Sequence, residues 1–99
     1  MIRHVVSWKF IADDASEKDA AFAELAASFG PLPHHIPAIK TLHFGRDLGE
    51  TSTNWDAVLI MDFDSTAELA EYQGHPLHQP VRDIVRRVTS ERSAIDFEL

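Results

Sequence analysis

The 99-residue chain contains no cysteine, which excludes disulfide bonds, thiolate metal sites, iron–sulfur clusters and a cysteine nucleophile. It also lacks any run of about 18 apolar residues, so we expect no segment to span a membrane. Cationic residues are scarce: 9 Lys and Arg stand against 16 Asp and Glu, giving a formal net charge of −7. Because nucleic acids and anionic membranes attract cationic patches, we expect neither as a partner. The first residues do not resemble a signal peptide, and we therefore expect a cytoplasmic protein.

The remaining composition is that of one small globular domain. Hydrophobic residues make up 44% of the chain and charged residues 25%, both ordinary values for a folded protein. The length allows one domain over residues 1–99 but not two. A chain of this size buries roughly two thirds of its unfolded surface, which suffices for one core and a small pocket. Six histidines are the feature that this composition leaves to explain.

Hydrophobic periodicity predicts the element order β-α-β-β-α-α-β. Residues 2–10 alternate between two faces, and His4 is the only ionisable side chain on the more apolar face. Ser16 is the expected N-cap of the first helix, which ends before Gly30. Residues 33–37 are expected to form an irregular, extended connector. The predicted strands cover residues 2–10, 39–44, 55–63 and 94–99, and the predicted helices cover residues 17–29, 64–74 and 79–88.

Four strands with helices on one face form a ferredoxin-like α+β sandwich around an antiparallel sheet. The helices of such a fold cover only one face of the sheet. The other face carries Val5, Val58, Ile60 and Ile95, which together are too apolar to remain in water. We therefore expect a homodimer with two-fold symmetry, in which the sheet faces of two copies pack together.

The bend from Tyr72 to His78 is the densest cluster of reactive side chains. It brings one phenol, Tyr72, and two imidazoles, His75 and His78, within seven residues. An imidazole can act as a base at neutral pH, and a tyrosine hydroxyl can hold a carbonyl oxygen and stabilise an enolate. Together they would support removal of a proton next to a carbonyl. The alternative is that these side chains only satisfy backbone groups in a bend that contains Pro76.

Other chemistry finds less support in the sequence. His75 and His78 are spaced to face one metal ion, but no third histidine stands at a suitable spacing, so we expect no metal and no cofactor. Dinucleotide-binding, Walker and nucleophile-elbow motifs are absent. Arg82, Arg86 and Arg87 are expected to form a salt-bridged helix surface. The remaining histidines are expected at solvated or packing positions, namely His34, His35 and His43.

Three segments resemble the stress-responsive A/B barrel family, also called Dabb domains. They are the opening strand that ends in Lys9-Phe10, the Ile36-Pro37 segment followed by Gly45, and Tyr72-x-x-His75-Pro76-x-His78. Together with the closing strand, the resemblance covers nearly the whole chain. It implies a ferredoxin-like monomer that dimerises through its sheet into an α/β barrel, in agreement with the predicted element order.

The resemblance also implies candidate site residues. Many members of the family are known only as small stress-associated proteins, but one plant member is a polyketide cyclase that closes a ring without a cofactor. The likeness implies that His78 is a general base, that Tyr72 holds the substrate carbonyl, and that His4 lines the same pocket. The other pocket residues implied are Val6, Trp8, Phe22, Leu59, His75 and Val81. The chain has Ala57 where that cyclase has a histidine, which implies a different or smaller substrate.

Three functions remain open at this point. The first is a homodimer of unassigned activity that binds a small hydrophobic or keto compound between its helices and its sheet. The second is a cofactor-independent cyclase, isomerase or lyase that uses His78 and Tyr72. The third is a relative of the dimeric-barrel monooxygenases or haem-degrading proteins, which share the fold. A pocket closed by Trp8 and Phe22, with His78 bonded to the backbone, would favour a non-catalytic role. An open cavity lined by Tyr72 and His78 would favour the enzyme.

Overall fold

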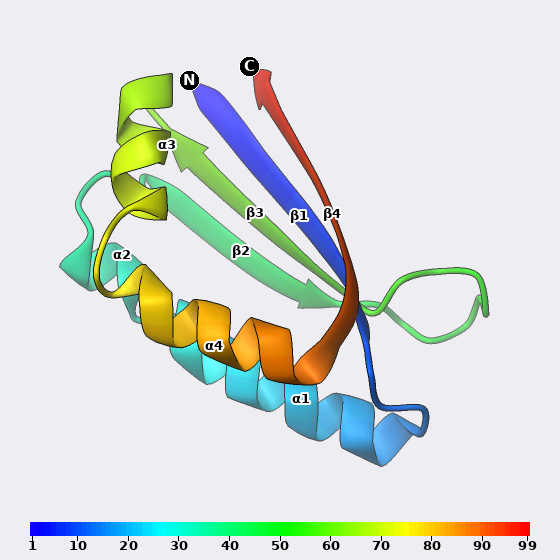
Figure 1. The fold of residues 1–99 in the computed structure, drawn as a ribbon. Helices are drawn as coiled ribbons and strands as arrows, with labels where there is room; N and C mark the ends of the chain where they lie inside the picture. The colour runs from blue at the N-terminus through cyan, green and yellow to red at the C-terminus, as the bar shows by residue number, and fades with distance from the viewer.

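A computed structural model describes residues 1–99 as a four-stranded sheet with helices on one face (Figure 1). The strands are all antiparallel and lie in the order β2-β3-β1-β4. This is the ferredoxin-like α+β sandwich predicted from the sequence. Figure 1 shows α1 and α4 running side by side along one face, and α3 beside the end of the sheet that holds both termini. In chain order the elements are β1 (Ile2–Phe10), α1 (Ala15–Phe29), α2 (Leu32–His35), β2 (Thr41–Arg46), β3 (Ala57–Phe63), α3 (Thr66–Gln73), α4 (His78–Val88) and β4 (Thr89–Glu98).

β1 lies at the centre of the core because it pairs on both sides and its alternate residues face the helices. Val6 lies opposite Leu59 of β3 and Ala94 of β4. The predicted two-residue alternation is confirmed, since every second residue of β1 from His4 onward is buried and the residues between them are only partly covered. The buried residues of this strand are His4, Val6, Trp8 and Phe10.

α1 begins two residues earlier than predicted. Its N-cap is Asp14, whose extended backbone precedes the first helical residue and whose side chain accepts the Glu17 N–H at 2.8 Å. Ser16, the predicted cap, lies inside the first turn, and its hydroxyl donates to the Asp14 carboxylate at 3.1 Å. A carboxylate at the cap satisfies a free backbone donor and carries the negative charge that the helix dipole favours at this end. The prediction that Ser16 caps the helix was therefore wrong. Aspartate and serine are both common N-caps, so the sequence alone does not distinguish Asp14 from Ser16.

Residues 33–37 contain a short helix rather than the predicted extended connector. α2 is a single turn that follows the end of α1. Pro33 falls in its first turn, where the missing backbone N–H costs little. Leu32 and Ile36 are both buried, and the Ile36 N–H donates to the Leu32 carbonyl at 2.9 Å. The turn forms because it brings these two apolar side chains onto the core.

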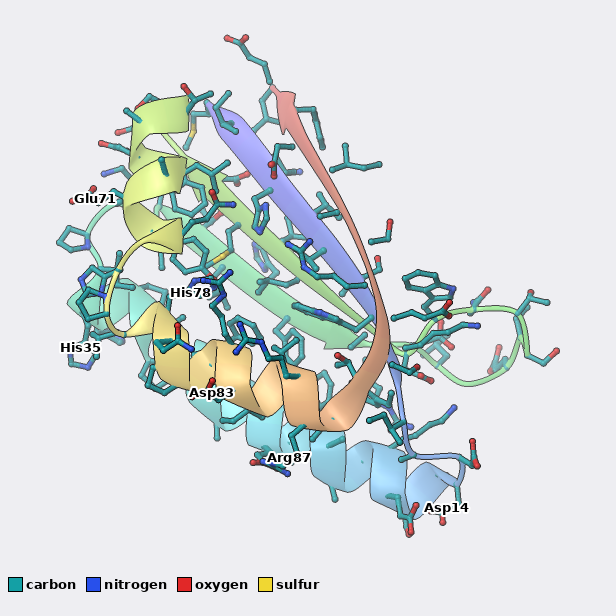
Figure 2. The ribbon with its side chains drawn as sticks, in the orientation of Figure 1. Asp14, His35, Glu71, His78, Asp83 and Arg87 are labelled. Carbon is teal, nitrogen blue, oxygen red and sulfur yellow. The ribbon has the colours of Figure 1, made fainter.

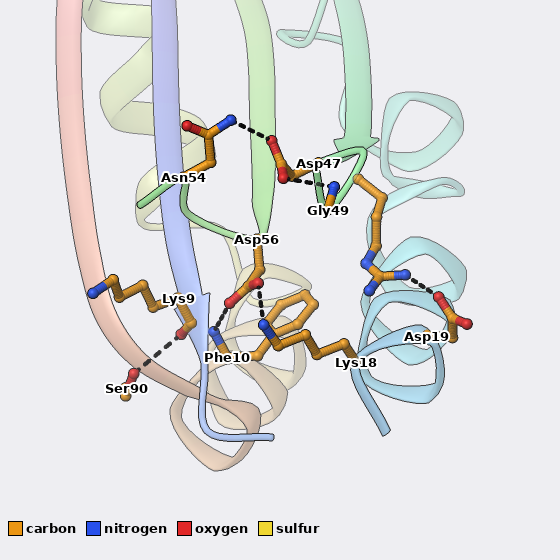
Figure 3. A network of polar contacts seen from close by, with 10 residues as sticks. Lys9, Phe10, Lys18, Asp19, Asp47, Gly49, Asn54, Asp56 and Ser90 are labelled. Carbon is orange, nitrogen blue, oxygen red and sulfur yellow. Dashed lines mark hydrogen bonds and ion pairs between the residues drawn. The ribbon is translucent and has the colours of Figure 1, made fainter. Parts of the chain in front are cut away.

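The strands β2 and β3 start two residues later than predicted. Ile39 belongs to a turn, since its N–H donates to the Ile36 carbonyl, and it packs into the core before β2 begins. β3 begins after Asp56, whose carboxylate accepts the Phe10 N–H at 2.8 Å and contacts Lys18 of α1 at 2.9 Å (Figure 3). A side chain thus replaces a backbone acceptor at this edge and fixes the start of α1 against the sheet.

β4 begins at Thr89, directly after α4, and not at Ala94 as predicted. Its first half is polar and shows no alternation, yet it pairs with β1 from Phe10 onward. Most of the strand is exposed because it lies at the edge of the sheet, beyond the cover of the helices. No helix in the structure combines the length and the apolar character that crossing a membrane requires.

The face of the sheet opposite the helices is only partly covered and carries apolar side chains from three strands. Val5 lies in register between Ile60 and Ile95, which makes an apolar row across β3, β1 and β4. Ile95 is 64% exposed and Phe97, two residues further along β4, is 43% exposed. Side chains of this kind are ordinarily removed from water when they form a contiguous patch.

Candidate functional site

A cavity of about 510 Å³ lies between the helix layer and the sheet, where α3 ends and α4 begins. Its volume is within the range of small-molecule sites in proteins. The apolar part of its wall consists of Trp8, Phe29, Leu59, Val81 and Val85. The polar part consists of Tyr72, Gln73, His78, Arg82, Arg86 and Arg92.

Tyr72 is held in this cavity by the last turn of α3. That helix begins at the Ser65 cap, which accepts the Glu68 N–H, and it ends at Gly74. The Tyr72 side chain is 1% exposed, and its ring lies 5.5 Å from the ring of Phe63 and 4.5 Å from that of His78. Burial raises the pKa of the phenol well above its ordinary value, against a smaller opposing effect of the nearby arginines. The hydroxyl therefore remains a hydrogen-bond donor at any physiological pH.

His78 is the first residue of α4, and its side chain points from the helix toward the space beneath the sheet (Figure 2). Its Nδ1 lies 3.2 Å from the Gln73 carbonyl oxygen, to which it donates its proton. A neutral imidazole bonded in this way keeps a lone pair on Nε2. Burial lowers the pKa of His78, the Gln73 contact raises it, and Arg82 lowers it further, with a net shift downward. The ring is thus a neutral base at neutral pH.

His4 contacts Asp96 on the neighbouring strand. The two residues lie directly opposite each other in the β1–β4 register, and His4 Nδ1 pairs with Asp96 Oδ1. His4 is buried, and its ring lies edge-on to Tyr72 with 6.5 Å between centroids. Asp96 thereby fixes the orientation of an imidazole that packs behind the tyrosine. Asp96 was not among the site residues predicted from the sequence, because neither strand alone determines the register in which β1 and β4 pair.

The residues expected in the pocket divide into two groups in the structure. Trp8, Leu59 and Val81 line the cavity together with Tyr72 and His78. The Trp8 Nε1–H is buried without a hydrogen-bond partner in the chain.

The other expected pocket residues lie outside the cavity wall. Phe22 of α1 stacks on Phe44 of β2 with 4.7 Å between the ring centroids and does not line the cavity. Val6 is fully buried in the core, and His4 lies behind Tyr72. His75 accepts the Leu77 N–H on its Nδ1 at 3.1 Å, so it supports the bend between α3 and α4.

The remaining histidines lie on the surface, and the three arginines of α4 (Arg82, Arg86 and Arg87) differ in their surroundings. His34 and His35 are exposed on α2, and His43 is exposed on β2. Arg87 pairs with Glu24 of α1, as expected for a salt-bridged surface. The other two arginines, Arg82 and Arg86, line the cavity instead. No three His, Asp or Glu side chains lie close enough together to hold a metal ion.

The fold and the cavity define the class of protein: a ferredoxin-like α+β domain with a tyrosine–histidine pair in a cavity between helices and sheet. The chain belongs to the stress responsive A/B barrel domain (Dabb) family, whose model matches residues 2–99. This confirms the family predicted from the sequence. None of the curated proteins compared matches the chain.

Solved structures support the same fold. A dimeric protein of unknown function with a ferredoxin-like fold from Bacteroides fragilis is 22% identical over 99% of this chain and 95% of its own, with a TM-score of 0.88. A dimeric ferredoxin-like protein of unknown function from Thermobifida fusca is 28% identical over 99% and 90%, with a TM-score of 0.84. A hydroxynitrile lyase from Passiflora edulis is 16% identical over 99% and 92%, with a TM-score of 0.81. The two bacterial proteins are described as dimeric, and their functions are unknown.

Proposed function

We propose that the domain binds a small carbonyl compound in its cavity and catalyses proton transfer at the carbon next to the carbonyl group, without a cofactor. The observation that carries this proposal is the neutral His78 imidazole, with its Nε2 lone pair free, packed against the buried Tyr72 phenol in an open cavity. Such a step begins ring closure, isomerisation and lyase reactions alike. A fold neighbour that is a hydroxynitrile lyase supports acid–base chemistry on this fold.

The two side chains have complementary roles in the proposed step. His78 Nε2 takes a proton from the carbon next to the carbonyl, and the electron pair of the broken C–H bond moves onto the carbonyl oxygen as an enolate. The Tyr72 hydroxyl donates a hydrogen bond to that oxygen and stabilises the developing charge. The high pKa of Tyr72 keeps its proton in place, and the low pKa of His78 keeps its base form available. The imidazolium then returns the proton to the same or a neighbouring carbon.

The open cavity favours this role over a non-catalytic one. A purely structural function would be supported by a pocket filled with Trp8 and Phe22. Phe22 instead stacks on Phe44, away from the bend, and the space beside Tyr72 and His78 stays empty of side chains. His75 and His78 both bond backbone groups of the bend through Nδ1, but His78 also lines the cavity and keeps its Nε2 lone pair free, whereas His75 lies outside the cavity.

Deuterium exchange tests the proposed step without knowledge of the natural substrate. Acetophenone in D₂O should gain deuterium at its methyl carbon faster in the presence of the protein, as followed by NMR. His78→Ala should slow this catalysed exchange by at least about a hundredfold, and Tyr72→Phe should slow it by about a hundredfold. His35→Ala, at an exposed position on α2, serves as the control and should exchange like the unmodified protein. Equal rates for His78→Ala and the unmodified protein would refute the proposal.

We also propose that the functional unit is a homodimer in which the faces opposite the helices pack together. The contiguous apolar row through Val5, Ile60 and Ile95 supports this arrangement, because it covers three strands and is left open by the helices. The dimeric state described for the Bacteroides fragilis and Thermobifida fusca proteins supports it as well. The cavity lies on the opposite side of the sheet and would remain accessible in such a dimer.

A further inference from the structure

The wall of the cavity is cationic although the chain is acidic. Three of the nine Lys and Arg residues line it, and none of the sixteen Asp and Glu residues does. Arg82 and Arg86 come from α4, and Arg92 comes from β4. A chain with a net charge of −7 thus places three of its nine cationic side chains, and no acidic one, in the wall of the cavity that holds Tyr72 and His78.

Two of these charges are not neutralised by the protein. Neither Arg82 nor Arg92 forms an ion pair with a carboxylate of the chain. Arg86 reaches only Asp83, at 3.6 Å on the exposed surface of the same helix. The next residue, Arg87, is an internal comparison, because it pairs with Glu24 and does not line the cavity.

The unpaired arginines stand beside the residues of the proposed reaction. Arg82 follows His78 by four residues in α4, which places the two side chains on the same side of the helix. Arg92 lies opposite Trp8 in the β1–β4 register, and both of their side chains line the cavity. Two separate elements therefore direct positive charge into one space. The effect of both charges on the pKa values of Tyr72 and His78 agrees with this placement.

We infer that the cavity selects compounds that carry a carboxylate as well as the carbonyl group, and that Arg82 and Arg92 bind this carboxylate. A guanidinium group offers paired N–H donors that match a carboxylate, and both arginines are exposed and free to receive one. The natural substrate would then be a keto acid. The carbonyl part of this inference rests on the proposed function, while the anion-binding part rests on the arginines alone. Phosphate and phosphonate groups offer similar oxygens, so the test must separate them from a carboxylate.

Matched probes test the inference. β-Benzoylpropionate is a keto acid, its primary amide is the neutral analogue, and the phosphonate that replaces its carboxylate is the alternative anion. Binding of each to the full chain is measured by calorimetry and by NMR shifts of the cavity residues. The protein should bind the acid at least roughly tenfold more tightly than the amide, and more tightly than the phosphonate. Arg82→Gln combined with Arg92→Gln should remove the preference for the acid while the amide still binds.

Arg87→Gln is the control, because it removes one positive charge from the same helix outside the cavity. It should keep the preference for the acid. Equal binding of acid and amide, tighter binding of the phosphonate, an equal loss in Arg87→Gln, or no binding of any probe would each overturn the inference.

The same protein samples separate this inference from the proposed function. His78→Ala should abolish deuterium exchange and leave the preference for the acid intact. If the unmodified protein binds the acid but exchanges no deuterium next to the carbonyl group of either acetophenone or the acid, the proton-transfer function fails and the anion site stands. If exchange occurs but acid and amide bind alike, the reaction stands and the anion site fails.

Discussion

His78 and Tyr72 are two titratable groups whose surroundings move their pKa values apart. Burial removes water from both rings, which disfavours the charged form of each: imidazolium for His78 and phenolate for Tyr72. The Gln73 carbonyl opposes this effect at His78 by accepting the Nδ1 proton, and it fixes which nitrogen stays free. The result is one proton acceptor beside one proton donor at the same pH, which is the arrangement that acid–base chemistry at a carbonyl requires.

The pH dependence of proton transfer follows from the lowered pKa of His78. Only the neutral imidazole can accept a proton, so the rate should rise with pH through the lowered pKa, below the ordinary value of 6.5, and stay level above it. The same shift makes the folded state bind a proton less readily than the unfolded chain, so His78 costs stability as the pH falls below 6.5. A pH–rate profile and an NMR titration of the His78 ring measure the two effects. A midpoint above 6.5 in either experiment would contradict the assigned environment.

The elements of this fold are held at their ends by side chains, and this is where sequence and structure differ most. Asp14 caps α1, Ser65 caps α3, and Asp56 replaces a backbone acceptor where β3 begins. Aspartate and serine are both common N-caps. The hydrophobic pattern in the sequence locates a helix, but the packing of the preceding turn decides which of several polar residues caps its first turn.

Replacement of the two candidate caps of α1 separates these effects. Asp14→Ala should lower the free energy of unfolding by about 1 kcal/mol, because the Glu17 N–H loses its acceptor and the helix loses a favourable charge at its start. Ser16→Ala should change it by clearly less, since the Ser16 hydroxyl satisfies no backbone donor. Urea unfolding followed by circular dichroism compares the two variants at one protein concentration. A larger loss in Ser16→Ala would assign the cap to the residue predicted from the sequence.

The strands show what periodicity can and cannot predict. β1 alternates clearly because one side of it packs under helices, so its bounds and its buried face follow from the sequence. The first half of β4 has no alternation, because an edge strand beyond the helices is exposed on both faces. Its register with β1 places Asp96 at His4 and Arg92 at Trp8, and neither contact has a signal in the sequence. Tyr72 and His78 could be found because they share one local bend, whereas their long-range neighbours could not.

At the scale of the whole molecule, the two faces of the sheet carry different side chains. The helix-facing side encloses the cavity with its arginines, and the opposite side carries the apolar row through Val5. One end of that opposite face is polar: Arg3 pairs with Asp62 through two contacts of 2.9 and 3.0 Å, and it holds the pKa of Asp62 at about 2. A charged pair beside an apolar row gives a packing surface a defined orientation as well as a driving force.

The proposed dimer predicts a selective effect of charge on the face opposite the helices. Ile95 is 64% exposed in the single chain, so Ile95→Glu should leave the fold of one chain intact. In a dimer packed through this face, the same carboxylate would be buried without a partner, which costs several kcal/mol. We therefore expect Ile95→Glu to shift the molar mass in light scattering from two chains to one.

Leu77→Glu is the matched control, because Leu77 is also an exposed apolar residue but lies in the bend between α3 and α4. This control should remain dimeric, and circular dichroism should show both variants folded. An unmodified protein with the mass of one chain, or the same mass for both variants, would mean that this face is not the interface. Because the cavity lies on the other side of the sheet, a monomeric Ile95→Glu should still bind the keto acid probe, which ties the dimer and the site to different faces of one domain.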